Sequence, residues 1–81
     1  MSKNTFNNPG MGECIILKDS LKEAKLVCAI NCNPPQYVIA HHINFQDGTW
    51  LHGEYLGNDI DKSLSSYNKY VQREKSKDNE R

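Results

Sequence analysis

An Asp-Gly pair at residues 47–48, flanked on both sides by β-forming residues, is the feature that most restricts the fold of this chain. Glycine accepts the positive φ that a tight turn requires, and Asp-Gly between two strand-like segments predicts a β-hairpin. The first predicted strand covers residues 36–45 (QYVIAHHINF) and the second covers residues 49–56 (TWLHGEYL). The chain is therefore expected to contain a small antiparallel sheet with this hairpin at its centre.

Further elements are predicted on both sides of the hairpin. Residues 13–18 (ECIILK) hold four consecutive apolar residues, which is typical of a short buried strand. A C-terminal helix is expected over residues 59–72, where Asn58 can cap the first turn. Its apolar stripe at helical spacing consists of Ile60, Leu64, Tyr67 and Val71. These elements predict an α+β fold in which the helix packs on the sheet.

Residues 20–31 support two interpretations. Ser20 followed three residues later by Glu23 forms a capping box, and LKEAKL favours helix, so a helix from Ser20 to Ala29 is the preferred prediction. The apolar residues after it also alternate with a period of two, which is typical of a strand. A turn at residues 20–23 followed by a further strand is therefore the alternative.

The composition of the two ends suggests where the domain begins and ends. Residues 1–12 and 73–81 are polar and lack an apolar period, so they are expected to be flexible. A single domain over residues 13–72 remains, which is small enough to be of marginal stability. A second copy in a homodimer, or another protein, could supply the missing burial.

Charge and cysteine content exclude several classes of protein. The 81 residues carry ten basic and ten acidic side chains, and this zero net charge argues against a nucleic-acid partner. We find neither a membrane-spanning run nor a signal peptide, so a cytoplasmic location is expected. In that compartment the three cysteines are predicted to be free thiols.

The register of the hairpin decides where the histidines lie. A two-residue loop would mix apolar and charged residues on one face, whereas a three-residue loop at 46–48 separates them better. The three-residue loop places His41 on the face that the helix covers, and it sets His42 opposite His52 on the other face. The apolar residues expected on the covered face are Ile39, Ile43, Phe45, Leu51 and Tyr55.

The uncovered face is the candidate contact surface for a partner protein. It carries a large aromatic side chain among polar groups, as interface anchors often do. The predicted partner-binding residues are Trp50, His42, His52, Glu54, Asn44 and, on the helix, Tyr70.

The same residues also permit chemical interpretations. In a regulatory domain, His42 and His52 could bind a metal with Glu54, or with Cys28 and Cys32 four residues apart on a helix. A cysteine could also act as a nucleophile beside a histidine, but the thiols lie in apolar runs where they are inert. We therefore expect no catalytic residue, no enzymatic activity, no metal site and no cofactor, with the metal-binding regulatory domain as an alternative. A self-associating structural protein is the other alternative.

The stretch YVIAHHINFQDGTWLHGEYL with the acidic helix after it, residues 36–72 in all, resembles small accessory proteins of bacteriophages and mobile elements. These include host-defence inhibitors such as anti-CRISPR proteins. The resemblance implies a non-enzymatic inhibitor that binds a host defence complex in the host cytoplasm. Many such inhibitors imitate nucleic acid with negative charge, whereas this neutral chain would act through shape and aromatic contacts.

Overall fold

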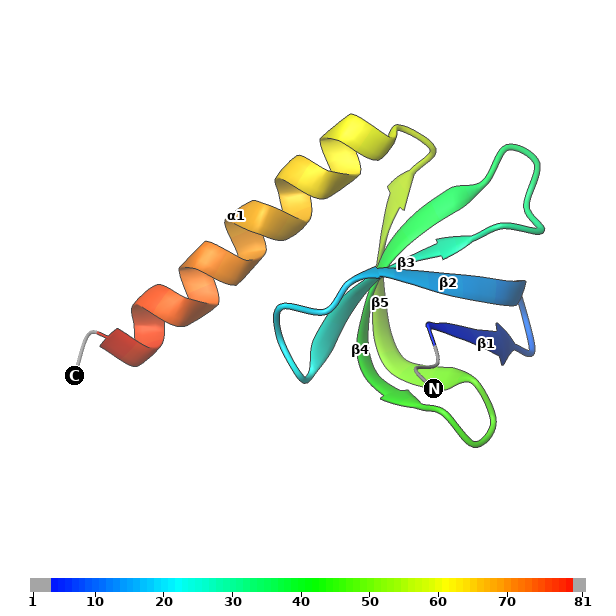
Figure 1. Ribbon diagram of the computed structural model, residues 1–81, viewed down its shortest axis with the longest axis horizontal. Coiled ribbons are helices and arrows are strands. Elements are labelled where there is room, and N and C mark those ends of the chain that lie inside the picture. Colours follow the sequence, from blue (N-terminus) through cyan, green and yellow to red (C-terminus); the bar gives the residue numbers. More distant parts are fainter. Residues whose placement is uncertain (1–3, 80–81) are drawn as a thin grey trace.

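The computed structural model describes residues 4–79 and places five strands before one helix (Figure 1). The helix, α1, is the last element of the chain. The bounds are β1 Thr5–Asn8, β2 Gly12–Lys18, β3 Ala24–Ala29, β4 Gln36–Asn44, β5 Thr49–Gly57 and α1 Ile60–Asn79. The prediction of a small antiparallel sheet with a C-terminal helix is confirmed.

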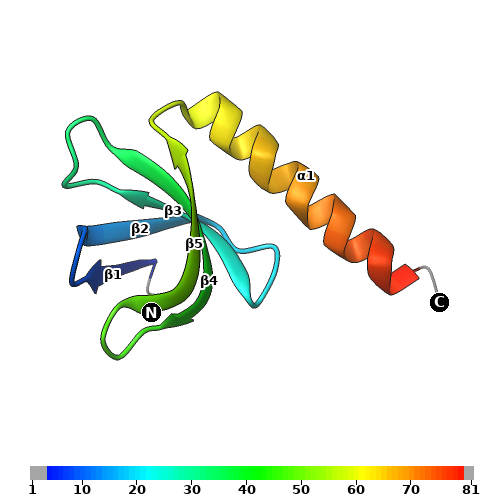
Figure 2. The same cartoon turned by 180° about the vertical axis from the view of Figure 1, so that it is seen from behind.

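The strands form one sheet in the order β1-β2-β3-β4-β5, with every neighbour antiparallel. The β4–β5 pair therefore lies at one end of the strand order. The predicted position of this hairpin at the centre of the sheet is wrong. The sheet curls strongly, and α1 lies on its outer side with its C-terminal half extending beyond the strands (Figures 1 and 2). The curl gives the sheet an inner and an outer face, and each face has its own apolar cluster.

The inner face is filled by side chains from all five strands. Its buried residues are Phe6, Cys14, Val27, Ala29, Val38 and Ala40, and Ile43 and Trp50 pack against them. Because the first and last strands both contribute to this cluster, burial of the inner face draws the two ends of the curled sheet together.

The outer face packs against α1. Ala24, Leu26 and Ile39 of the sheet meet Tyr67 and Val71, which lie one helical turn apart. The helix begins where the Asp59 side chain accepts a hydrogen bond from the Lys62 backbone N–H at 3.1 Å. Asp59 therefore acts as the N-cap, in place of the predicted Asn58.

The predicted helix over residues 20–29 is wrong, and the alternative strand is correct. Residues 24–29 form β3 at the centre of the sheet, and most of its side chains are buried. Leu26 packs under the helix while its neighbour Val27 enters the inner cluster. A strand between two covered faces buries successive residues on opposite sides, and this burial outweighs the helix propensity of LKEAKL.

The predicted hairpin register is also wrong. Asn44 pairs with Thr49, so the loop has four residues instead of three, and His41 rather than His42 lies opposite His52. His42 adopts a left-handed backbone with φ of 57°, and its N–H donates to the Glu23 carbonyl oxygen at 2.8 Å. This irregularity reverses the alternation of side chains, so both Ile39 and Ile43 are covered but on opposite faces of the sheet.

The two ends of the chain are more structured than predicted. Residues 5–8, within the segment expected to be flexible, form β1. The helix does not end at residue 72 but continues to Asn79, because residues 73–79 contain neither glycine nor proline and consist largely of residues compatible with helix. Residues 1–3 and 80–81 of the two expected flexible segments lie outside the described residues.

Candidate protein-contact surfaces

The structure distributes the six predicted partner-binding residues over three places. Trp50 is half-buried on the inner face, where its ring meets Phe6 edge-on at 6.2 Å. His42 and Asn44 are exposed near the β4–β5 turn, where the Asn44 side-chain oxygen accepts the Gln46 N–H at 2.9 Å. The remaining three residues, His52, Glu54 and Tyr70, lie together beside the helix. The single face predicted from the sequence therefore does not exist.

The group beside the helix is completed by His41. The His41 ring lies 5.3 Å from that of His52 and 5.5 Å, edge-on, from that of Tyr70, between centroids. His41 Nε2 is 3.3 Å from a carboxylate oxygen of Glu54. His41 is thus on the helix side as predicted, but it is partnered by polar groups. Even a charged pair that is partly exposed contributes only about 0–1 kcal/mol, so this contact is not a major source of stability.

A groove of about 300 Å³ lies next to that group, between β5 and the helix. Lys69 and Arg73 line its helix side, while Glu54 lines its sheet side. Burial and the nearby carboxylates of Glu74, Glu54 and Glu23 raise the pKa of Tyr70. Tyr70 therefore keeps its hydroxyl proton at neutral pH.

The cysteines are free thiols, as predicted, but they do not share a helix face. Cys14 and Cys28 are buried and Cys32 is partly buried. Cys28 lies on β3, so the four-residue spacing to Cys32 has no helical meaning. Within residues 4–79, no group of three or more His, Cys, Asp or Glu side chains is arranged to hold a metal ion.

Burial makes Cys14 the least reactive thiol that we can identify. Burial, and secondarily the neighbouring Cys32 and Cys28 thiols, raise the pKa of Cys14 from 9.0 to about 11. Because folding raises this pKa, protonated Cys14 stabilises the fold fully below pH 9, and that contribution is lost as the pH rises through about 11.

Alkylation at pH 8 is expected to modify Cys32 before Cys14. A thiol with a pKa of about 11 is only about one part in a thousand thiolate at pH 8. Timed iodoacetamide quenching followed by peptide mass spectrometry measures each site. Adding urea should release Cys14, whereas rapid labelling of Cys14 in the native protein would contradict its placement in the inner cluster.

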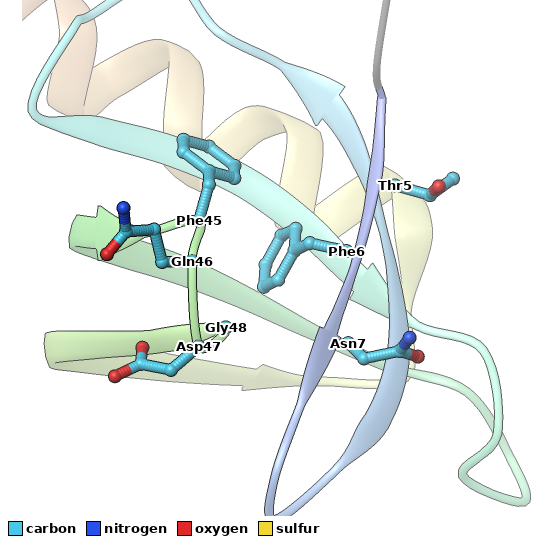
Figure 3. Close-up of a pocket in the computed structure, with 7 residues that line it drawn as sticks. All are labelled: Thr5, Phe6, Asn7, Phe45, Gln46, Asp47 and Gly48. Carbon is cyan, nitrogen blue, oxygen red and sulfur yellow. The ribbon is translucent and has the colours of Figure 1, made fainter.

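A cleft of about 620 Å³ lies between β1 and the β4–β5 turn. Figure 3 shows the Phe6 ring extending from β1 toward the turn, with Phe45 beside it. The two rings meet edge-on, with centroids 5.5 Å apart. Phe6 is 8% exposed whereas Phe45 is 51% exposed. The cleft therefore has an aromatic base and one aromatic wall that water can reach. Its lining residues are Thr5, Phe6, Asn7, Phe45, Gln46, Asp47 and Gly48.

The walls of this aromatic cleft are held by hydrogen bonds between strand and turn. The Asn8 side-chain amide donates to the Gly48 carbonyl oxygen at 2.8 Å, across 40 residues of sequence. The Asp47 carboxylate accepts hydrogen bonds from the Thr49 hydroxyl at 2.7 Å and the Thr49 N–H at 3.0 Å. These bonds lower the pKa of Asp47, so its carboxylate is ionised at neutral pH. These hydrogen bonds hold the turn in a defined conformation.

The sequence offered a signal for only one half of the aromatic cleft. Phe45 was expected on the covered face, and Phe6 was part of a segment with no predicted element. Phe6 is the only aromatic residue before Tyr37 in the chain, so a large apolar side chain in a polar segment was the available indication.

Two further apolar side chains are exposed on β5. Leu51 is 81% exposed and Tyr55 is 64% exposed, although both were predicted to be covered by the helix. The helix packs on the outer face of the sheet, where it also meets Leu56 of β5, whereas Tyr55 lies opposite Val38 of the inner cluster. They form an apolar surface separate from the aromatic cleft.

No family model matches this chain, and no curated protein or solved structure is significantly similar to it. In the described part of the chain, no helix combines the length and the apolar character needed to cross a lipid bilayer.

Proposed function

We propose that this protein is a non-enzymatic module that binds another protein directly, through the aromatic cleft. The half-exposed Phe45 ring carries this proposal. Exposing half of a phenylalanine to water is unfavourable, and a partner that covers the ring recovers that free energy. Aromatic anchors at the centre of a concave, polar-rimmed surface commonly supply much of the binding free energy between proteins.

The composition of the aromatic cleft favours a protein segment as its occupant. Phe6 and Phe45 offer edges and faces to one aliphatic or aromatic side chain. Thr5, Asn7 and Gln46 also line the cleft, and polar groups of these residues can hydrogen-bond to the backbone of a bound loop. The chain has no net charge, which favours contact by shape over electrostatic imitation of nucleic acid.

The partner class that we propose is a component of a host defence complex in the host cytoplasm. The resemblance of residues 36–72 to phage and mobile-element accessory proteins, including anti-CRISPR proteins, supports this choice. Binding would then inhibit the complex by blocking one of its surfaces.

Replacing Phe45 by alanine is expected to weaken binding to the partner by about tenfold to a hundredfold, as for an interface hot spot. Ile60→Ala is the matched control, because Ile60 is similarly exposed (45%) but lies at the start of α1. Partner proteins that crosslink to the wild-type chain in a bacterial lysate are identified and purified. Calorimetry then measures the affinity of each partner for the wild type, Phe45→Ala and Ile60→Ala. Equal affinities for wild type and Phe45→Ala, with both folded, would exclude the aromatic cleft as the contact surface.

A further inference from the structure

Strand β5 ends the sheet, and among the described residues no further strand is hydrogen-bonded to its other side. Free edges invite pairing with other chains, and proteins usually protect them with lysine, proline or a covering element. Residues 49–57 (TWLHGEYLG) contain neither lysine nor proline. They instead expose Leu51 and Tyr55, two of the most exposed large apolar side chains of the described chain. This edge is therefore suited to adding another strand.

The backbone direction on β5 follows from the hydrogen bond of His42. Its N–H donates to Glu23, so it points from β4 toward β3. Backbone groups alternate between the two sides of an antiparallel strand, and those of Ile39 and His41 therefore point toward β5. Their partners on β5 are Glu54 and His52. Gly53 lies between His52 and Glu54, and Tyr55 follows Glu54. Both therefore direct their backbone N–H and C=O groups to the free side of β5.

The order of side chains along β5 is self-complementary. In an antiparallel pair of two β5 strands centred on Gly53, His52 lies opposite Glu54 of the partner subunit. Leu51 then lies opposite Tyr55 of the partner subunit. Each polar residue thus meets a group of complementary charge or hydrogen bonding, and each exposed apolar residue meets another. Gly53, at the centre, pairs with itself and turns its backbone groups outward in both copies, as this register requires.

Two neighbouring registers also bring the outward N–H and C=O groups of the two β5 strands opposite each other, but they pair the side chains less favourably. A shift of two residues in one direction sets Glu54 opposite Glu54 of the partner subunit, which places like charges in contact. A shift in the other direction sets His52 opposite itself and leaves Leu51 opposite Gly53. The charge pattern therefore selects the pairing centred on Gly53.

We propose that two copies of this chain associate through β5, giving a two-fold symmetric dimer with a continuous ten-stranded sheet. The occupant of the edge is thus a second copy of the chain. This inference is independent of the proposed function, because the aromatic cleft lies between β1 and the turn and uses neither Leu51 nor Tyr55. One surface would join the copies and the other would remain available to a different protein.

Charge substitutions on β5 test this register with the full chain. His52→Glu places glutamates opposite each other twice in the dimer, and we expect dimerisation to weaken by about twofold to thirtyfold. The double variant His52→Glu, Glu54→Lys restores opposite charges and should recover most of the lost affinity. Tyr55→Lys should give a monomer, whereas Ile60→Lys, outside the edge, should leave the dimer unchanged. Sedimentation velocity from about 1 µM to about 1 mM measures each equilibrium.

Hydrogen exchange at low and high protein concentration gives a second measurement. The amide hydrogens of Gly53 and Tyr55 should gain protection as the dimer forms, while those of His52 and Glu54 are already protected by β4. A wild-type chain that stays monomeric throughout this range would overturn the proposal. A dimer that resists both His52→Glu and Tyr55→Lys, or that is broken by Phe45→Ala, would also overturn it, since another surface would then join the copies.

Discussion

Replacing Tyr67 by phenylalanine is expected to lower the free energy of unfolding by about 1–3 kcal/mol, although the ring itself remains. Tyr67 is fully buried between α1 and the sheet. Its hydroxyl donates to the Ala24 carbonyl oxygen at 2.7 Å and accepts the Leu21 N–H at 3.3 Å. Phenylalanine would leave both backbone groups without this partner, and the buried carbonyl cannot readily turn to water. The loss is therefore dominated by the cost of an unsatisfied buried group.

Tyr67→Ala is expected to cost more, about 3–5 kcal/mol, because it also removes the largest side chain of the outer cluster. Small domains have total stabilities of about 5–15 kcal/mol, so this variant would lose much of its margin. The expected consequence is that α1 separates from the sheet and exposes Leu26 and Ile39, which it otherwise covers. Helix signals in circular dichroism should then decrease before those of the sheet.

Urea unfolding of wild type, Tyr67→Phe and Tyr70→Phe measures the first of these losses. Tyr70 is the matched control, since it lies on the same helix with its ring only partly buried against His41. Tyr70→Phe should change the free energy of unfolding by less than about 0.5 kcal/mol. Equal losses in the two variants would mean that the Tyr67 hydroxyl does not hold the helix to the β2–β3 connection.

The same tyrosine illustrates what the sequence could predict. The spacing from Ile60 to Val71 is a property of a single segment, so the helix and the burial of Tyr67 followed from it. The hydrogen-bond partners of the Tyr67 hydroxyl could not be predicted, because Leu21 and Ala24 lie more than 40 residues away in sequence. Those two residues also belong to the segment whose helical propensity was misleading.

The misassigned strand has a comparable cause. A capping box at Ser20 and Glu23 is a local signal, whereas β3 is formed by pairing with β2 and β4 on both sides. Local signals predict an element correctly when its own residues supply the stabilisation. In β3 the stabilisation comes from two neighbouring strands and two covered faces, which the segment does not encode by itself.

The predicted single polar face of the hairpin is not formed, for a related reason. The notion of one polar face on residues 36–56 assumed uninterrupted alternation, and the left-handed backbone of His42 breaks it. His42 is held there by Glu23, a contact that required knowledge of β3. The pairing of Phe6 with Phe45 likewise depends on the curl of the whole sheet, so half of the aromatic cleft had no counterpart in the hairpin sequence.

Replacing Gly48 by alanine should be the most damaging of the glycine substitutions in the turns, costing about 3 kcal/mol or more. Gly48 has a φ of 78°, which is unfavourable for alanine. A Cβ atom at this position would in addition overlap the backbone carbonyl oxygen of Asn7. Because that obstacle is backbone, β1 would have to move away from the turn, and the hydrogen bond from Asn8 to Gly48 would be lost.

Gly57→Ala separates the cost of a positive φ from the cost of the overlap with β1. Gly57 has a similar φ of 88°, but a Cβ atom there would meet nothing within 4 Å. This variant should therefore lose only the conformational term, about 1–2 kcal/mol. Urea unfolding of both variants, followed by fluorescence, measures the difference, and Trp50 is the only tryptophan in the chain.

The fluorescence of the folded Gly48→Ala protein shows whether its loss of stability comes with a change in the aromatic cleft. Phe6 on β1 packs edge-on against both Phe45 and Trp50, so displacement of β1 removes Phe6 from both rings. Emission of Trp50 should then shift to longer wavelength in Gly48→Ala and stay unchanged in Gly57→Ala. Partner binding through the aromatic cleft should weaken in Gly48→Ala alone. Equal stability losses in the two variants, without a shift in emission, would mean that β1 is not held against the turn and that the cleft lacks its β1 wall.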